Sequence, residues 1–317
     1  MYQIGIDIGG TNVKIGLLDE TLELTAEASI PFPHTTAVDM AKKIRAAVLA
    51  LLEERNASLS GVESLGAVVP GSIDAAGETV VDAHNLNFHN VPLRKILSDA
   101  FPGIPVYIAN DANAAALGEV VAGCAQNVDS AVILTLGTGV GSGVVLNGKI
   151  LTGCTGGAAE LGHMVVEDGG ALCACGRKGC FETYASATGL IRMAKEAMAQ
   201  HPESLLHATA AEVGDVNGQT IFRAKEQGDP TAVAVVERYI HYLSVGIANV
   251  INCFYPEVVA LSGGIANQGE ALLAPLREAV APQVYGNQYL QTHTRILGCT
   301  LGYHAGIIGA AMLPTAL

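Results

Sequence analysis

The most constraining feature of the sequence is a pattern that occurs twice: an apolar strand, a turn rich in Gly and Thr, and a second apolar strand. The first copy, YQIGIDIGGTNVKIGLLD, covers residues 2–19, and Ile4, Ile6 and Ile8 alternate in it as in a β-strand. The second copy, SAVILTLGTGVGSGVVLNG, covers residues 130–148. Either copy alone is also compatible with a plain hairpin. Together they predict a duplicated α/β domain whose Gly-rich turns bring backbone N–H groups to phosphate oxygens.

Predicted helices and strands alternate through the rest of the chain, as is typical of α/β folds. Apolar residues follow helical spacing in residues 36–55, 112–122, 184–200, 230–253, 272–280 and 305–312, and the short runs 23–30, 62–69 and 104–109 are predicted strands. A third Gly pair, Gly263-Gly264, follows the apolar run VVALS. This pair predicts a turn that accepts the adenine and ribose of a nucleotide.

Asp111 lies at the transition from the predicted strand 104–109 to the predicted helix 112–122. In open α/β sheets, ligands bind at the carboxyl ends of the strands. Asp111 is therefore either the N-cap of the helix, a common position for Asp, or a catalytic carboxylate if Asn110 supplies the cap. Asn85, in a polar and turn-rich region, is likewise either a contact to substrate hydroxyl groups or a turn cap.

Composition excludes several classes of protein. The net charge of −13 argues against binding to nucleic acid or to an anionic membrane surface, although backbone N–H groups can still bind an anionic nucleotide. We expect no secretory leader and no membrane span, because no basic start with an apolar run and no apolar run of about 20 residues is present. Seven cysteines, three of them clustered, fit a reducing compartment, so a cytoplasmic enzyme is expected.

The clustered cysteines lie in the segment ELGHMVVEDGGALCACGRKGCFE, from Glu160 to Glu182. Three thiols and one imidazole, from Cys173, Cys175, Cys180 and His163, are the donor set of a closed tetrahedral zinc site. Such a site has no open position for water, so the zinc would be structural and would hold the flanking carboxylates in place. The alternative is a group of ordinary buried thiols near an unrelated histidine, which the Cys-x-Cys-x4-Cys spacing disfavours.

Five motifs carry a resemblance to a known family: Asp7-x-Gly9-Gly10-Thr11, Asn110-Asp111, Gly137-Thr138-Gly139-x-Gly141, Glu160-x-x-His163 and Cys173-x-Cys175-Gly176-x-x-Gly179-Cys180-x-Glu182. The chain resembles the ROK family of sugar kinases and sugar-responsive proteins, most closely its bacterial glucokinase-like branch. The resemblance covers essentially the whole chain. It implies an actin-like (ribonuclease H-like) fold of two α/β domains and transfer of the γ-phosphoryl group of ATP, with Mg²⁺, to a sugar hydroxyl, usually on C6.

The resemblance also assigns residues and domains. It implies that Asp111 is the general base, that substrate is bound by Gly71, Asn85, Asn110, Asp111, Glu160, His163 and Glu182, and that structural zinc is bound by His163, Cys173, Cys175 and Cys180. ATP and Mg²⁺ would be bound by Asp7, Gly9, Gly10, Thr11, Lys14, Gly137, Thr138, Gly139, Gly263 and Gly264. The implied domains are a small one, 1–118 with a C-terminal helix at 301–317, and a large one, 119–300, that contains the zinc segment 160–182.

The sequence departs from the family at two positions. Ser142 occupies a position where relatives often have a third Gly, and Phe88 one where many relatives have a larger aromatic residue. The second departure is expected to alter the sugar pocket.

Several functions stay open within this resemblance. Glucose is the first substrate expected, with N-acetylmannosamine, N-acetylglucosamine, allose and fructose as alternatives. A sugar-binding repressor is disfavoured because the first Gly-rich turn lies too near the start of the sequence for a helix-turn-helix to precede it. A non-catalytic sugar sensor is disfavoured because Asp7, Asp111 and both Gly-rich turns are intact. The expected partners are a monosaccharide and ATP, and a homodimer or homotetramer is the expected assembly.

Overall fold

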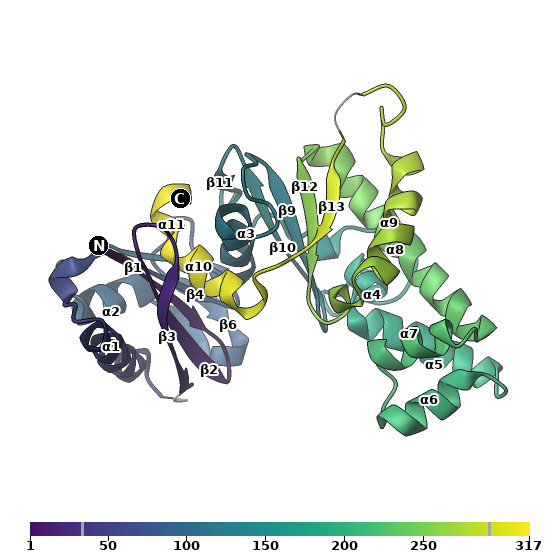
Figure 1. Ribbon diagram of the computed structural model, residues 1–317, viewed down its shortest axis with the longest axis horizontal. Helices are drawn as coiled ribbons and strands as arrows, with labels where there is room; N and C mark the ends of the chain where they lie inside the picture. Colours follow the sequence, from purple (N-terminus) through teal and green to yellow (C-terminus); the bar gives the residue numbers. More distant parts are fainter. Residues whose placement is uncertain (33–34, 291–292) are drawn as a thin grey trace. The chain divides into compact units, whose positions relative to one another are not determined.

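The computed structural model describes residues 1–32, 35–290 and 293–317, which form two compact units (Figure 1). Unit 1 comprises Met1–Ile133, Gly143–Ala159 and Thr300–Leu317, and unit 2 comprises Leu134–Ser142 and Glu160–Cys299. The domain boundaries expected from the sequence, 1–118 with 301–317 and 119–300, stay a prediction.

Unit 1 contains a five-stranded sheet with the order β3-β2-β1-β4-β8. Its strands are β1 (Tyr2–Ile8), β2 (Asn12–Leu18), β3 (Leu24–Pro31), β4 (Val62–Val69) and β8 (Val106–Asn110). The first three strands are antiparallel, whereas β1, β4 and β8 run parallel to one another. The carboxyl ends of these three parallel strands therefore meet at one edge of the sheet.

Helices cover both faces of this sheet. The alternating side chains of Ile4, Ile6 and Ile8 share one core with the buried residues of α1 (Ala37–Glu54) and α2 (Leu93–Ala100). Residues of α3 (Asp111–Ala122), α10 (Ala305–Ala311) and α11 (Leu313–Ala316) pack with Val68 in a second apolar cluster or with Leu18 in a third. The C-terminal segment is thus part of unit 1.

Glycines allow α10 to approach its neighbours closely. A β-carbon at Gly5 of β1 or at Gly66 of β4 would overlap the backbone of α10 at Ile307 and Ala310, respectively. A β-carbon at Gly309 of α10 would likewise overlap the carbonyl group of Ala114 in α3. Only glycine fits at these three positions without movement of the backbone.

Unit 1 also has a small sheet that the sequence analysis did not predict. Its antiparallel strands are β5 (Ser72–Ile73), β6 (Val80–Ala83) and β7 (Phe88–Val91), joined by short turns. Phe88 is 3% exposed and packs edge-on against Phe32, with ring centroids 6.3 Å apart. The Phe88 side chain thus belongs to the core of unit 1, and the expectation that it alters the sugar pocket stays a prediction.

A second five-stranded sheet repeats the topology of the first, with the order β11-β10-β9-β12-β13. Its strands are β9 (Ala131–Leu136), β10 (Val140–Leu146), β11 (Lys149–Ile150), β12 (Val258–Ser262) and β13 (Arg295–Gly298). Strands β10 and β11 are antiparallel, as β2 and β3 are in the first sheet. Strands β12 and β13 are parallel, as β4 and β8 are. The duplicated α/β fold predicted from the two hairpins is confirmed.

Unit 2 contains strands β12 and β13 and helices α4 (Glu182–Ala185), α5 (Ala187–Gln200), α6 (Leu205–Val213), α7 (Gly218–Glu226), α8 (Pro230–Phe254) and α9 (Glu270–Val280). The single helix expected at 184–200 is broken at Ser186, whose hydroxyl accepts the N–H of Gly189 and caps α5. The break matters because it places the start of α5 beside the turn between β9 and β10, as described below.

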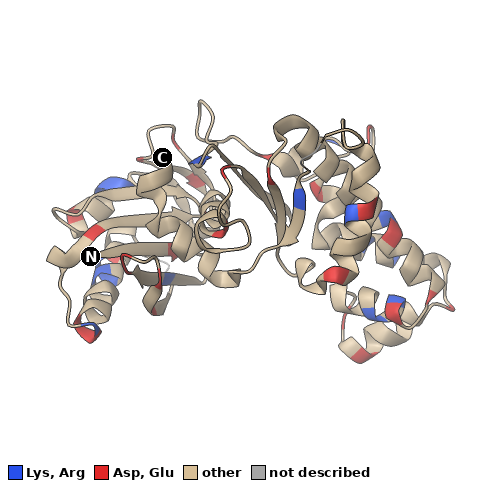
Figure 2. Ribbon diagram, turned by 45° about the horizontal axis from the view of Figure 1, so that its top comes forward, with Lys and Arg blue, Asp and Glu red and all other residues tan. Residues whose placement is uncertain are grey.

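Charges of both signs lie on the helices of unit 2, as Figure 2 shows in red and blue. Arg192 pairs with Glu196 at 2.6 Å, and Arg277 pairs with Glu270 at 2.7 Å. Each of these two arginines therefore has an acidic partner on its own helix. Among the described residues, none of the helices combines the length and apolar character that a membrane span requires.

Candidate active site and metal centre

The polar residues predicted to act in unit 1 lie at the carboxyl edge of its sheet. Asp7 of β1 is in register with Val68 of β4, and Val69 is in register with Asn110 of β8. This pairing brings Asp7 and Asp111 close together: burial is the main cause of the raised pKa of Asp7, and the Asp111 charge adds a smaller rise. The parallel strands thus gather at one edge the two carboxylates that are far apart in sequence.

Asn110 is the N-cap of α3. Its Oδ1 accepts the N–H groups of Ala112 at 2.9 Å and Asn113 at 3.1 Å, while its Nδ2 donates to the carbonyl of Gly71 at 3.0 Å. Of the two interpretations of this turn, the structure therefore has Asn110 as the cap. Asp111 is the first residue of the helix, and its Oδ1 also accepts the N–H of Ala112 at 2.9 Å.

Both carboxylates have perturbed proton affinities. Burial raises the pKa of Asp111, and the N–H of Ala112 only partly offsets this. Burial also raises the pKa of Asp7, opposed by the ammonium group of Lys14, whose Nζ lies 3.9 Å from Asp7 Oδ2. A partly buried carboxylate with a raised pKa is a better proton acceptor than an exposed one.

The Gly9–Thr11 turn adjoins the region of Asn85. Gly9 donates its N–H to the carbonyl of Asn12 at 2.9 Å, which closes the turn. A β-carbon at Gly10 would lie 3.4 Å from the carbonyl oxygen of Asn85. The structure therefore brings the first predicted phosphate turn next to a predicted substrate contact in unit 1.

In unit 2, the turn at Gly137 and the turn at Gly263-Gly264 lie at the ends of β9 and β12. Gly263 follows β12 with φ of +91°, and a β-carbon there would lie 2.7 Å from the carbonyl carbon of Leu136, the last residue of β9. The hydroxyl of Ser262 donates to that of Thr135 at 3.0 Å. No atom lies within 4 Å of the β-carbon positions of Gly137 and Gly264, so both turns have open space beside them among the described residues.

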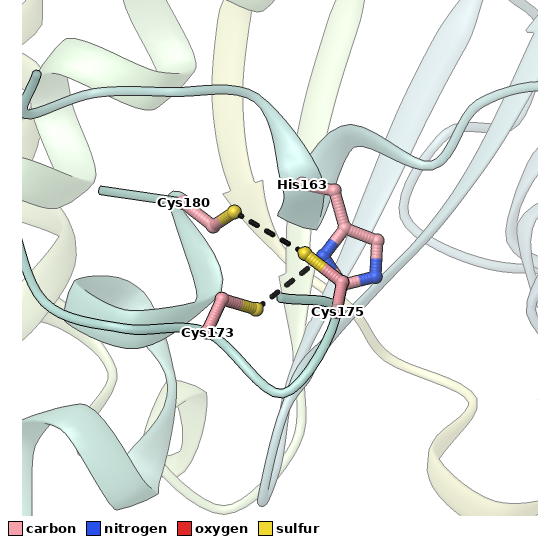
Figure 3. A group of neighbouring side chains, drawn as sticks. All are labelled: His163, Cys173, Cys175 and Cys180. Carbon is pink, nitrogen blue, oxygen red and sulfur yellow. Dashed lines mark hydrogen bonds between the residues drawn. The ribbon is translucent and has the colours of Figure 1, made fainter. Parts of the chain in front are cut away.

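The predicted zinc ligands converge (Figure 3). One donor atom each of His163, Cys173, Cys175 and Cys180 lies within 4.8 Å of the other three. The Sγ atoms of Cys175 and Cys180 are 3.7 Å apart, and Cys173 Sγ is 3.7 Å from His163 Nδ1.

These distances can be compared with a tetrahedral zinc site. Bonds of about 2.3 Å to sulfur and about 2.0 Å to nitrogen give sulfur–sulfur edges of about 3.8 Å and sulfur–nitrogen edges of about 3.5 Å. The donor set fits zinc in chemistry, and the two distances of 3.7 Å are close to these edges. Burial raises the pKa of the Cys173 thiol, and that of Cys180 to about 12, so a bound metal would have to displace these protons.

The carboxylates that flank the metal centre differ in their surroundings. Glu182 Oε1 accepts a hydrogen bond from Cys173 Sγ at 3.6 Å, and its Oε2 accepts the N–H of Val140 at 3.1 Å. His163 turns Nδ1 toward the sulfur atoms and its other ring nitrogen away from them (Figure 3). Glu160 is exposed and precedes the short helix Leu161–His163. The structure thus joins Glu182 and His163 to the cysteines.

Two contacts at these sites were missed in the sequence analysis. A β-carbon at Gly306 would lie 3.1 Å from Asp7 Oδ2, so the absence of a side chain there leaves room beside the carboxylate. Ser142 uses its hydroxyl to accept the N–H of Leu161 at 3.1 Å. No local sequence pattern indicates the role of Gly306. Ser142, in contrast, stands where the family often has Gly, and this difference could have indicated a contact of its hydroxyl.

Comparison with known proteins gives a consistent result. The ROK family model matches residues 3–316. A glucokinase from Thermotoga maritima is 36% identical over 98% of this chain and 96% of its own length. The crystal structure of a ROK family glucokinase from Streptomyces griseus in complex with glucose and AMPPNP is 34% identical, with a TM-score of 0.74 over 99% of each chain.

Further relatives extend this picture. The ROK hexokinase from Thermus thermophilus is 32% identical, with a TM-score of 0.82 over 98% of this chain and 97% of its own. A xylose repressor from Bacillus subtilis is 27% identical over 98% of this chain, but the match covers 76% of the repressor. The two α/β units have the actin-like, ribonuclease H-like fold of the kinases, as expected.

Proposed function

The chain belongs to the ROK family, and from that premise we propose that it transfers the γ-phosphoryl group of ATP to a hydroxyl group of a hexose, with the C6 hydroxyl of glucose as the first candidate. The chain is a sugar phosphotransferase. The observation that carries the finer proposal is the position of Asp111, a partly buried carboxylate at the carboxyl ends of the parallel strands. Asn110, and not Asp111, caps helix α3.

Asp111 accepts the proton of the attacking hydroxyl group. The hydroxyl oxygen forms a bond to the γ-phosphorus, the bond from that phosphorus to the bridging oxygen of ADP breaks, and the proton passes to the Asp111 carboxylate. Phosphoryl transfer depends mainly on positioning and on neutralisation of charge. A positioned general base adds a factor of about 10²–10⁴ in rate.

Backbone N–H groups of the Gly-rich turns bind the phosphate groups of the donor. The first turn contributes Gly9, Gly10 and Thr11, the second Gly137, Thr138 and Gly139, and the Gly263-Gly264 turn contacts the nucleoside. Asp7 is the residue that would hold Mg²⁺, directly or through water, and Mg²⁺ when bound neutralises charge on the phosphate oxygens. Lys14, at 3.9 Å from Asp7, adds a positive charge at the same edge.

Sugar hydroxyl groups are bound by paired donors and acceptors. In unit 1 these are Asn85, Asn110 and the backbone at Gly71, and in unit 2 they are Glu160, Glu182 and His163. The structural zinc proposed for His163, Cys173, Cys175 and Cys180 keeps two of these contacts, His163 and Glu182, in fixed positions. The distances within the cluster and the two hydrogen bonds of Glu182 support this role.

A coupled assay of ADP release over a panel of sugars tests the proposal. The panel contains glucose, N-acetylmannosamine, N-acetylglucosamine, allose and fructose, and NMR of the product identifies the phosphorylated hydroxyl. We expect ADP release with at least one hexose and phosphate on C6. The resemblance to repressors makes sugar binding without turnover the second candidate. Binding of a sugar by calorimetry with no ADP released from any member of the panel would establish that candidate instead.

A further inference from the structure

The turn between β9 and β10 is held from one side by the start of α5. The carbonyl of Gly137 accepts the N–H of Ala187 at 2.8 Å. The carbonyl of Thr138 accepts the hydroxyl of Thr188 at 2.8 Å. Ala187 is the first residue of α5, so this contact also satisfies one of the N–H groups that every helix start leaves without an intrahelical partner.

These two bonds determine where the N–H groups of the turn point. In a trans peptide unit the carbonyl and the following N–H point in opposite directions. With the carbonyls of Gly137 and Thr138 held on the α5 side, the N–H groups of Thr138 and Gly139 point away from α5. Among the described residues, neither N–H has a hydrogen-bond acceptor. Successive N–H groups that point the same way form an anion-binding site.

A third contact fixes the end of the same turn. Glu182 Oε2 accepts the N–H of Val140 at 3.1 Å, and a β-carbon at Gly139 would overlap that oxygen. A side chain at position 139 would therefore displace the Glu182 carboxylate from the N–H of Val140. All three contacts come from the short segment 182–188, which is confined to unit 2 together with the turn.

We propose that Ala187 and Thr188 are positioning residues of the phosphoryl-donor site: they hold two carbonyl groups of the turn and thereby present the N–H groups of Thr138 and Gly139 to the phosphate oxygens of the donor. The inference rests on the proposed function, because it assigns this turn to ATP. Both residues act through the carbonyl groups of the turn. They act on the affinity for ATP and not on the affinity for sugar.

Two variants remove one contact each without disturbing the helix. Thr188→Val keeps the shape of an exposed side chain and loses the hydroxyl donor. Ala187→Pro loses the N–H donor at the first helical position, where proline is tolerated, and its ring also displaces the Gly137 carbonyl from that place, while the preceding Ser186 already has the extended backbone that proline requires. Thr188→Ser restores the hydroxyl and serves as the rescue.

Each variant is compared with a matched control in unit 1. Thr315→Val removes a hydroxyl that also donates to a carbonyl at 2.8 Å, and Ala37→Pro places proline at the first position of α1 after the extended Thr36. The measurements are KM for ATP, KM for the sugar, and binding of AMPPNP by calorimetry without sugar. We expect Thr188→Val and Ala187→Pro each to weaken AMPPNP binding and raise KM for ATP by about threefold to tenfold, with KM for sugar unchanged.

The outcomes separate the inference from the proposed function. Wild-type values for AMPPNP binding and for KM of ATP in both variants would overturn the inference, and so would an equal rise in KM for sugar. Recovery by Thr188→Ser together with normal behaviour of both controls would support it. Failure of the wild-type protein to release ADP with any hexose would instead contradict the proposed function.

Discussion

Asn110 and Asp111 are neighbours in sequence, and Asn110 caps α3 so that Asp111 is not needed for that purpose. Asn110 Oδ1 accepts the N–H groups of both Ala112 and Asn113. An amide in place of the Asp111 carboxylate keeps an oxygen that can accept the N–H of Ala112. Substitution of Asp111 by Asn therefore removes a charge and a base but leaves the start of the helix intact.

Asp111→Asn is expected to lower kcat by about a hundredfold or more and to leave sugar binding nearly unchanged, because the amide cannot accept the proton of the attacking hydroxyl. Steady-state kinetics and sugar titration by calorimetry measure the two effects separately. Asp99→Asn, which alters an exposed carboxylate paired with Lys95 on α2, is the control and should retain wild-type kinetics. Near-wild-type turnover of Asp111→Asn would refute the assignment of the base.

The same substitution is expected to stabilise the folded protein. Burial raises the pKa of Asp111 in the native state, so the native state holds this proton more tightly than the unfolded chain. The stability that this bound proton contributes is fully present below the ordinary Asp pKa. It is lost as pH rises through the raised pKa of Asp111. At pH 8, Asp111→Asn should therefore raise the midpoint of thermal unfolding by about 1–4 °C, and the gain should shrink as pH falls through the raised pKa of Asp111 toward the ordinary Asp value. A midpoint below that of wild type at pH 8 would contradict the burial argument.

The pH dependence of catalysis follows from the same shift. A base must be deprotonated to act, so the acid limb of kcat/KM is expected above the pH at which an ordinary aspartate titrates. A pH profile of kcat/KM between pH 4 and 8 measures it, with stability checked at each pH. An acid limb at or below the ordinary Asp pKa would show that a different group limits the rate.

The metal centre is tested by a pair of cysteine substitutions. Cys175→Ser removes one of the four donors and is expected to lower the zinc content of the purified protein and the affinity for sugar, because His163 and Glu182 lose their fixed positions. Cys253→Ser, at another exposed cysteine, should retain both. Elemental analysis and sugar titration are the measurements. Absence of zinc from the wild-type protein prepared without chelator would rule out the structural role proposed for the cluster.

Close packing of α10 predicts a strong effect of a single methyl group. Gly309→Ala places a β-carbon in the space of the Ala114 carbonyl, so α3 and α10 must move apart. We expect the free energy of unfolding to fall by about 1–3 kcal/mol or more. Gly61→Ala is the matched control, since no atom lies within 4 Å of its β-carbon position. Equal stability of the two variants in urea unfolding would contradict the described packing.

Much of the fold was predictable because strand and helix periodicity is local. The predicted strand 62–69 coincides with β4, and the predicted helix 36–55 contains α1. The small sheet β5–β7 was missed because its strands have two to four residues and are too short to show an alternating pattern. Its last two strands are separated by a turn in which Asn87 adopts φ of +55°. The break at Ser186 was missed because the apolar spacing continues across it.

The site was predictable where its residues are close in sequence. The spacing of the three cysteines determined their convergence, since Gly176 and Gly179 have positive φ and turn the chain between them. Contacts between distant segments could not be predicted in this way. The hydroxyl of Thr188 reaches the carbonyl of Thr138, and Gly306 lies beside Asp7, only because strands and helices from separate parts of the chain pack together.

The most direct test of the account is a crystal structure of the protein with AMPPNP and the hexose that it phosphorylates bound together. The account predicts that an Asp111 carboxylate oxygen lies about 2.6–3.2 Å from one sugar hydroxyl, with that hydroxyl facing the γ-phosphate. A complex in which the carboxylate lies beyond hydrogen-bond reach of every sugar hydroxyl, with the γ-phosphate in place, would contradict it.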